Sequence, residues 1–116
     1  MIARRIMKYV PPYDTREKHF PGFNYCGPGT NVTRRMKNNV KPVDALDRAA
    51  FEHDLVTEPR GPYRGKDNPK AMRAADRRLM QAAIKLRNEG YRPRWVADAV
   101  IAAMAYLLKT GARGRK

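Results

Sequence analysis

The chain has 116 residues and a mass of 13.3 kDa, which allows one compact domain and leaves little room for a second. Its 25 Lys and Arg residues against 11 Asp and Glu residues give a formal net charge of +14, so the surface attracts polyanions, either nucleic acid or an anionic membrane. The single cysteine, Cys26, excludes an intrachain disulfide, and the longest apolar run, Trp95–Leu108, is too short for a transmembrane helix.

The first 20 residues are rich in charge, proline and tyrosine and show no clear apolar periodicity. Pro11 and Pro12 favour extended and turn conformations, so we expect residues 1–20 to form an N-terminal arm. Charged residues near the start, with neither an apolar stretch nor a small-residue cleavage site after them, predict that the segment is not a secretory signal.

A glycine-rich loop follows at Tyr25–Gly29, with the sequence Tyr-Cys-Gly-Pro-Gly. Two glycines on either side of a proline cannot continue a helix or a regular strand, which predicts a tight loop with unusual dihedral angles. The next stretch, residues 31–41, is polar and basic, and we expect it to be exposed.

The first helix is predicted to begin after Asp44 and to run to about Val56, with Pro59 ending it. Asp44 is a good N-cap, and Asp47 places a second carboxylate in the first turn, where the helix dipole favours it. One stripe along this helix is formed by Leu46, Ala49, Ala50, His53 and Val56.

Two further helices follow a Pro- and Gly-rich loop at residues 58–68, which has room for a short hairpin. The second helix is predicted to begin with Asn68 as its N-cap and to end near Asn88, and the third to span about Pro93–Lys109. Trp95 and Tyr106 on the third helix would suit a lipid boundary. The alternative, which we favour, is a core helix, because three helices of this length need one another's apolar faces.

Two polar residues occupy positions where helical periodicity predicts apolar side chains. His53 lies on the stripe of the first helix, and Asp76 lies on the apolar face of the second, between Met72 and Met80. A buried carboxylate is costly unless it is paired, and an imidazole can donate one ring N–H to it while the other nitrogen serves as a base. Antiparallel helices packed about 8–10 Å apart could bring the two together. The alternative is a solvent-facing Asp76 and a lone structural His53.

Asp54 projects about 100° around the helix from His53, so it can serve a different partner. The loop Tyr25–Gly29 offers one, because glycines allow a turn in which several carbonyl oxygens point to one spot. Calcium takes carbonyl and carboxylate oxygens at about 2.3–2.6 Å. The loop and Asp54 are therefore a candidate calcium site, whereas Gly-Pro-Gly alone is more often a plain turn.

The order of these motifs resembles the phospholipase A2 family. Tyr25–Gly29, Pro42–Arg48 and the pair His53-Asp54 look like that family's calcium loop and catalytic helix, and Ala74–Arg77 looks like the segment with its second catalytic aspartate. The Tyr-x-Gly-Pro-Gly form, the short chain and the lack of disulfides are most similar to the phospholipase A2 domain of parvovirus minor capsid proteins. The resemblance covers about residues 20–88.

The resemblance implies a mainly α fold: a calcium loop, two antiparallel catalytic helices and a C-terminal third helix, without disulfides. The chain would then divide into an N-terminal arm at residues 1–20, a phospholipase A2-like catalytic core at 21–92, a helix packed on that core at 93–110, and a basic tail at 111–116.

The resemblance also implies roles for individual residues. His53 would deprotonate the water that attacks the sn-2 ester of a glycerophospholipid, and Asp76 would hold His53 in the right tautomer. The metal and the Gly27 N–H would stabilise the oxyanion. The implied calcium ligands are the carbonyls of Tyr25, Gly27 and Gly29 and the carboxylate of Asp54.

The sequence departs from the family pattern in places. Cys26 is expected to be a small buried thiol, because the family's disulfide-forming cysteines are replaced here by Ala49, Ala50, Ala74 and Ala75. Where the family has a tyrosine that hydrogen-bonds the second aspartate, this chain has Thr57, and Tyr63 or Tyr91 is a candidate substitute. His19 is expected to be an ordinary exposed histidine.

These features together predict a calcium-dependent phospholipase A2 that acts at a phospholipid surface, with anionic lipid favoured. The subtype predicts a virion protein, in contact with other capsid proteins, that breaches a host endosomal membrane during entry; a bacterial or phage origin is the alternative. The main rival is a basic capsid-associated or nucleic-acid-binding structural protein with an inactive phospholipase-like fold. A third reading is a calcium-dependent membrane-binding module without turnover.

Overall fold

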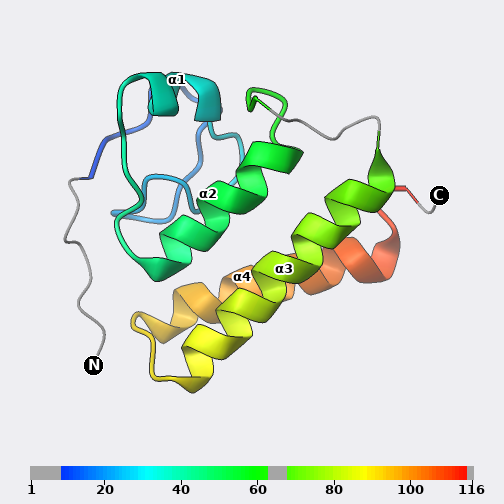
Figure 1. Cartoon of the computed structure of the whole chain (residues 1–116). Helices are drawn as coiled ribbons and strands as arrows, with labels where there is room; N and C mark the ends of the chain where they lie inside the picture. The colour runs from blue at the N-terminus through cyan, green and yellow to red at the C-terminus, as the bar shows by residue number, and fades with distance from the viewer. Residues whose placement is uncertain (1–8, 63–67, 115–116) are drawn as a thin grey trace.

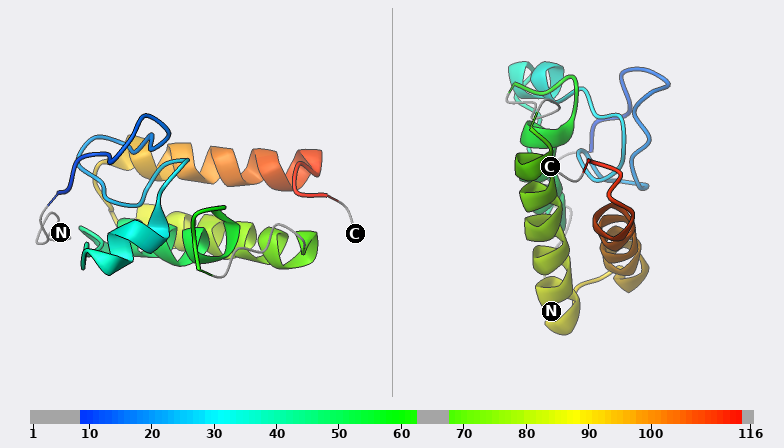
Figure 2. Two further views of the ribbon diagram at one scale, coloured as in Figure 1. Left: turned by 90° about the horizontal axis from the view of Figure 1, so that it is seen from above. Right: turned by 90° about the vertical axis from the view of Figure 1, so that its right-hand side faces the viewer.

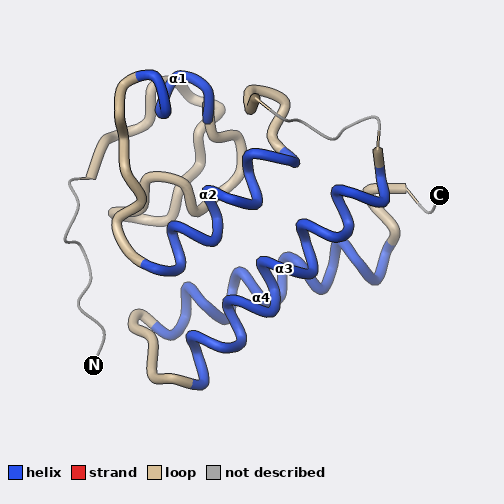
Figure 3. The backbone as a smooth tube through the Cα atoms, in the orientation of Figure 1, coloured by secondary structure: helices blue, strands red, loops and turns tan. Residues whose placement is uncertain are grey.

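The computed structural model describes residues 9–62 and 68–114, and these residues contain helices and loops but no strand (Figure 3). Its helices are α1 (Val32–Lys37), α2 (Ala45–Thr57), α3 (Pro69–Asn88) and α4 (Arg94–Thr110). The predicted mainly α fold is confirmed. In the same part of the chain no helix is both long enough and apolar enough to cross a membrane. The hairpin predicted within residues 58–68 falls largely on 63–67, outside the described residues.

The ends of the three long helices follow from local chemistry. The Asp44 side chain accepts the Asp47 N–H at the start of α2, and the Asn68 side chain accepts the Ala71 N–H at the start of α3. Gly111 ends α4 in the left-handed conformation, with φ of 70°. The three predicted helices are therefore confirmed to within about a residue at most ends.

The helices form two layers. α2 and α3 run antiparallel and side by side in one layer, while α4 lies in the other and runs antiparallel to α3 (Figures 1 and 2). The loops of residues 9–30 share the layer of α4 and cover α2 (Figure 2). The catalytic helices of the prediction are thus direct neighbours, with a loop layer and a third helix against one face of the pair.

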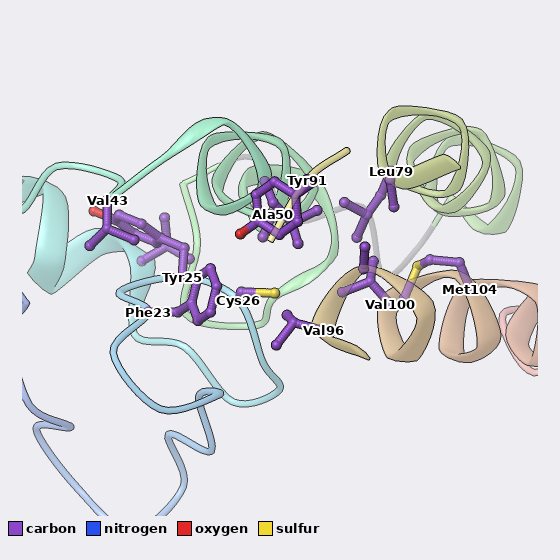
Figure 4. Packing of buried hydrophobic residues seen from close by; sticks show 14 residues of the cluster. Phe23, Tyr25, Cys26, Val43, Ala50, Leu79, Tyr91, Val96, Val100 and Met104 are labelled. Carbon is purple, nitrogen blue, oxygen red and sulfur yellow. The ribbon is translucent and has the colours of Figure 1, made fainter. Parts of the chain in front are cut away.

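The apolar core lies between these layers (Figure 4). It draws on the loop before α1, on α2 and α3, and on the inner face of α4. Cys26 is 2 % exposed and lies beside Val96, so the prediction of a small buried thiol is confirmed. The principal large residues of the core are Phe23, Tyr25, Leu46, Leu79, Tyr91, Val96, Val100 and Met104.

α4 is a core helix with two exposed aromatic residues. Val96, Ala97 and Val100 are buried, which confirms the favoured prediction that this helix covers the others. Trp95 and Tyr106 nevertheless remain 57 % and 64 % exposed. The helix therefore supplies both core contacts and an aromatic surface.

The prediction that residues 31–41 are exposed is wrong in part. α1 forms there, and both Val32 and Arg35 are fully buried. Arg35 can be buried because its guanidinium forms an ion pair with Glu17, whose side chain is also 0 % exposed, at 3.0 Å.

The same guanidinium connects α1 to the N-terminal segment. Arg35 also donates to the carbonyls of Val10 and Pro11, at 3.1 and 3.0 Å. Burial acts to raise the pKa of Glu17, but hydrogen bonds from Arg35 and from two backbone N–H groups outweigh it and lower that pKa to about 2. Residues 9–20 therefore pack on the folded body, and the predicted domain boundaries stay a prediction.

Candidate active site

The centre of the site is a buried histidine–aspartate pair between α2 and α3. His53 Nε2 lies 2.7 Å from Asp76 Oδ1, and Asp76 is 0 % exposed. Burial acts to raise the pKa of Asp76, but hydrogen bonds from His53 and Arg113 outweigh it and lower that pKa. A carboxylate that stays ionised here fixes the proton of His53 on Nε2 and leaves Nδ1 to act as a base. The predicted contact between His53 and Asp76 is confirmed.

Asp54 occupies the other side of the same imidazole. Its Oδ1 lies 3.3 Å from His53 Nδ1, while its Oδ2 is buried and has no hydrogen-bond partner. Burial raises the pKa of Asp54 to about 7. Burial also acts to lower the pKa of His53, but hydrogen bonds to Asp54 and Asp76 outweigh it and raise that pKa. A buried carboxylate oxygen without a partner is the kind of group that a cation would stabilise.

The glycine-rich loop lies against Asp54. The hydroxyl of Thr30 is 3.5 Å from the Tyr25 carbonyl and 3.2 Å from the Gly27 carbonyl, so these two oxygens face one point. The nearby Thr30 hydroxyl slightly opposes the rise in pKa that burial gives Asp54. The structure therefore brings together Asp54 and two of the three predicted carbonyl ligands.

The third predicted carbonyl, that of Gly29, has a different partner. It accepts a hydrogen bond from Arg60 Nη2 at 2.6 Å, and the Gly29 N–H donates to Glu58 at 3.2 Å. Arg60 is itself paired with Asp14 at 2.6 Å. Gly29 can bind a cation only if its carbonyl leaves this guanidinium.

Two glycines allow the loop to take this path. Gly27 and Gly29 have φ of +145° and +81°, and a Cβ at either would collide with a backbone carbonyl oxygen, that of Lys18 or that of Arg16. The segment before the loop pairs with it through the Lys18 N–H and the Pro28 carbonyl, at 2.9 Å. The preceding segment thereby uses the Cys26 and Pro28 carbonyls, through the Phe20 and Lys18 N–H groups, whereas the Tyr25 and Gly27 carbonyls face the Thr30 hydroxyl.

The residues present fit a calcium ion through carbonyls and one carboxylate rather than through a cluster of acids. Within residues 9–62 and 68–114, no three His, Cys, Asp or Glu side chains gather in a way that could hold a metal. The Tyr25 and Gly27 carbonyls and the unpartnered Asp54 Oδ2 are hard oxygen donors of the type that calcium prefers.

The reactive groups open onto an apolar cavity of about 650 Å³. This volume lies in the range of small-molecule binding sites. His53, Asp54 and Gly27 line it together with Arg113. The main apolar side chains that line it come from α3, α4 and the loop layer: Phe20, Met72, Leu79, Val100, Met104, Tyr106 and Leu107.

A polar array beside an apolar cavity suits ester chemistry on a lipid, and a comparison with known families agrees. The model of the phospholipase A2-like domain family matches residues 16–98, which is more than half of the chain. The chain belongs to the phospholipase A2-like family. Comparison with curated proteins and with solved structures gave no match. The family predicted from the motifs is confirmed, and the parvovirus subtype stays a prediction.

The phospholipase A2-like match contains all the predicted site residues, from Tyr25 to Asp76, but it ends inside α4. Arg113 therefore lies outside it. The Arg113 guanidinium contacts both oxygens of Asp76, with Nε 3.1 Å from Oδ2 and Nη2 3.2 Å from Oδ1. Sequence reasoning missed this residue, because a basic residue in a basic tail gives no local signal.

The sequence offered three hydroxyl groups that could hydrogen-bond Asp76. Neither of the two that the structure describes contacts Asp76. The Thr57 hydroxyl lies 3.4 Å from His53 Nδ1, and the Tyr91 hydroxyl donates to Asp44 Oδ2 at 2.7 Å. Tyr63 lies outside the described residues. Thr57 thus contacts the histidine rather than Asp76.

The prediction that His19 is an ordinary exposed histidine is wrong. The residue is half-buried, and its Nε2 lies 2.9 Å from the Thr30 hydroxyl. Burial, with the nearby Arg35 cation, lowers the pKa of His19 to about 4. A neutral His19 therefore supports the hydroxyl that contacts the loop carbonyls.

Asp47 holds the start of the glycine-rich loop, and the residue before it, in place. This fully buried carboxylate accepts four backbone N–H groups at 2.8 to 3.1 Å, three of them from consecutive loop residues. Burial raises the pKa of Asp47 and the N–H donors oppose that rise. The sequence indicated only a favourable place in the helix dipole, whereas the structure shows an anchor. The donors are Asn24, Tyr25, Cys26 and Val43.

Replacing Asp47 with asparagine is expected to lower the free energy of unfolding by roughly 3 kcal/mol, because an amide NH₂ would face backbone N–H groups that need an acceptor. Urea unfolding followed by circular dichroism measures the change. Asp98→Asn, at an exposed position on α4, is the matched control and should stay within about 0.5 kcal/mol of the parent. An Asp47→Asn midpoint equal to that of the control would contradict the anchoring role.

Proposed function

We propose that this phospholipase A2-like chain is a calcium-dependent phospholipase A2, which hydrolyses the sn-2 ester of glycerophospholipids. The observation that carries the proposal is the buried array of Asp76, His53 and Asp54 beside an apolar cavity. Family membership supports phospholipase A2 activity in general. The cavity can accept an acyl chain, and the array supplies a base at its wall.

In the proposed reaction His53 Nδ1 takes a proton from a water molecule, whose oxygen attacks the ester carbonyl carbon. The Nε2–H donates to Asp76, so the imidazolium that forms is stabilised by a buried negative charge. When the carbon–oxygen bond to the glycerol breaks, His53 gives the proton to the leaving oxygen. A fatty acid and a lysophospholipid are released, and no covalent enzyme intermediate is needed.

Calcium would supply positive charge next to the ester oxygen and the lipid phosphate. Tyr25 and Gly27, through their carbonyls, and Asp54, through its carboxylate, would hold it; Gly29 would join only on leaving Arg60. Gly27 lines the cavity, so its N–H is the backbone donor proposed for the oxyanion.

We propose a phospholipid surface as the partner. Trp95 is exposed and packs edge-on against Phe20, which lines the cavity, with ring centroids 5.5 Å apart. Tyr106 also lines the cavity and is exposed. Aromatic side chains favour the membrane–water interface, and the net charge of +14 favours anionic lipid. These features support a cavity that opens toward a membrane.

The test is release of fatty acid from vesicles of mixed phosphatidylcholine and phosphatidylglycerol labelled at the sn-2 chain. Release is expected with calcium, to stop when a chelator removes it, and to return when calcium is added in excess. Vesicles labelled at the sn-1 chain are the matched control and should release no label. Release that continues in chelator, or that comes equally from the sn-1 chain, would contradict the proposal.

The rival function is binding of nucleic acid by an inactive phospholipase-like fold. The net charge of +14 favours it, since exposed basic residues attract phosphate backbones. A binding protein has no need for a buried Asp76 held against His53, so the site favours catalysis. Duplex DNA binding without lipid hydrolysis would select the rival. The viral setting, with other capsid proteins as partners and entry through a host endosomal membrane, stays a prediction.

A further inference from the structure

The carboxylate of Asp76 has two partners, and the second comes from the C-terminal turn. Its Oδ1 accepts from His53 Nε2 at 2.7 Å and from Arg113 Nη2 at 3.2 Å, and its Oδ2 accepts from Arg113 Nε at 3.1 Å. The Nε and Nη2 donors are the two adjacent groups on one side of the guanidinium, so they fix the plane of the carboxylate as well as its charge.

The turn that carries Arg113 is held against the start of α3. Gly111 takes the left-handed conformation at the end of α4, and the Gly114 N–H donates to the Gly111 carbonyl at 2.8 Å. The Gly114 carbonyl in turn accepts a hydrogen bond from Arg73 on α3. A Cβ added at Gly114 would lie 3.2 Å from Pro69. These contacts place the guanidinium at Asp76 without relying on the tail beyond residue 114.

Without Arg113, the buried Asp76 would lose the partner of its Oδ2. The side chain of Asp76 is 0 % exposed and that of Arg113 is 21 % exposed, so the ion pair is largely shielded from solvent. A carboxylate held at one oxygen only can rotate, and the direction of the hydrogen bond to His53 then changes. Arg113 also contributes to the lowered pKa of Asp76.

We propose that Arg113 is the positioning residue of the His53–Asp76 pair, so that the C-terminal turn is part of the active site. Arg113 acts through Asp76 and does not transfer a proton itself. The proposal deepens the proposed phospholipase activity and rests on it. It also gives a functional role to the C-terminal turn, which lies beyond the family match that ends at residue 98.

The test compares Arg113→Met and Arg113→Lys with the parent and with Arg77→Met, which removes the same charge from an exposed position next to Asp76 on α3. Hydrolysis of a short-chain phosphatidylcholine below its micelle concentration separates kcat from KM. Arg113→Met should lower kcat by about 10–100-fold with KM unchanged. Arg113→Lys should recover part of kcat, because lysine restores the charge but not the paired donors. Arg77→Met should match the parent.

Nitrogen-15 NMR of the His53 ring gives a readout that does not depend on turnover. When the ring is neutral, the parent should carry its proton on Nε2, and Arg113→Met should shift part of the population to the other tautomer. If the parent itself releases no fatty acid, the proposed function fails, and this spectrum alone decides the role of Arg113.

An unchanged His53 tautomer in Arg113→Met overturns the proposal, with or without a fall in kcat. A rise in KM at constant kcat also overturns it, because Arg113 would then contact substrate rather than position Asp76. If Arg113→Met does not fold, Arg113→Lys takes its place: a kcat and a tautomer equal to the parent's overturn the proposal.

Discussion

Replacing His53 with glutamine is expected to lower sn-2 hydrolysis by about 10²–10⁴-fold while calcium affinity stays close to that of the parent. Glutamine can keep a hydrogen bond to Asp76, but it cannot take a proton from water. The loss should appear in kcat, since the histidine acts in the chemical step. Fatty-acid release under single-turnover conditions measures the rate, and isothermal titration measures calcium binding.

The matched control for His53→Gln is Asp98→Asn, which changes one exposed side chain on α4 and should keep the parental rate. A thermal midpoint near that of the parent would show that the lost rate is not lost folding. Removal of a general base is expected to cost at least about 100-fold in rate. Activity above about a tenth of the parent's would therefore contradict the role of His53. A fall in calcium affinity that matched the fall in rate would place His53 in the metal site instead.

The parts of the fold that follow from neighbouring residues were predictable. Asp44 and Asn68 begin helices through side-chain hydrogen bonds, and Gly111 ends α4 by taking the left-handed conformation; such local chemistry is visible in a sequence. The contact between His53 and Asp76 was predictable for a related reason. Each occupies an apolar face at helical spacing, and two such faces on neighbouring helices pack together.

The parts that depend on contacts between distant residues were not predictable. The exposure expected for residues 31–41 was wrong in part because Arg35 forms an ion pair with Glu17, 18 positions earlier, and a buried ion pair has no signature in either segment. Asp76 and Arg113 are 37 positions apart. Asp47 looked like an ordinary residue of the first helical turn, although its oxygens organise the loop before α1.

The candidate calcium site shows the same division between local and distant contacts. The glycines of the loop and Asp54 were recognisable as oxygen donors from their sequence pattern. The hydrogen bond from Arg60 to the Gly29 carbonyl was not, because the two residues are 31 positions apart and Arg60 lies in a loop without periodicity. The family pattern implied three equivalent carbonyls, whereas the structure distinguishes that of Gly29 from those of Tyr25 and Gly27.

Replacing Asp54 with asparagine is expected to abolish both calcium binding and hydrolysis without unfolding the chain. Asp54 Oδ2 is the buried oxygen without a partner, so its charge is the main attraction for the ion. In chelator, the Asp54→Asn substitution would remove a buried carboxylate whose Oδ2 has no partner, so stability should equal or exceed that of the parent. Titration calorimetry and thermal unfolding, each with and without calcium, measure the two effects.

The contrast between the two conditions makes this test of Asp54 specific. A ligand that binds only the folded state at 100 times its dissociation constant stabilises it by about 2.7 kcal/mol, so calcium should raise the thermal midpoint of the parent by roughly 10 °C. Asp54→Asn should lose that rise, whereas Asp98→Asn should keep it. If Asp54→Asn kept the calcium-dependent rise, the ion would bind elsewhere. If it unfolded in chelator, Asp54 would be a structural carboxylate rather than the ligand that its unpartnered oxygen indicates.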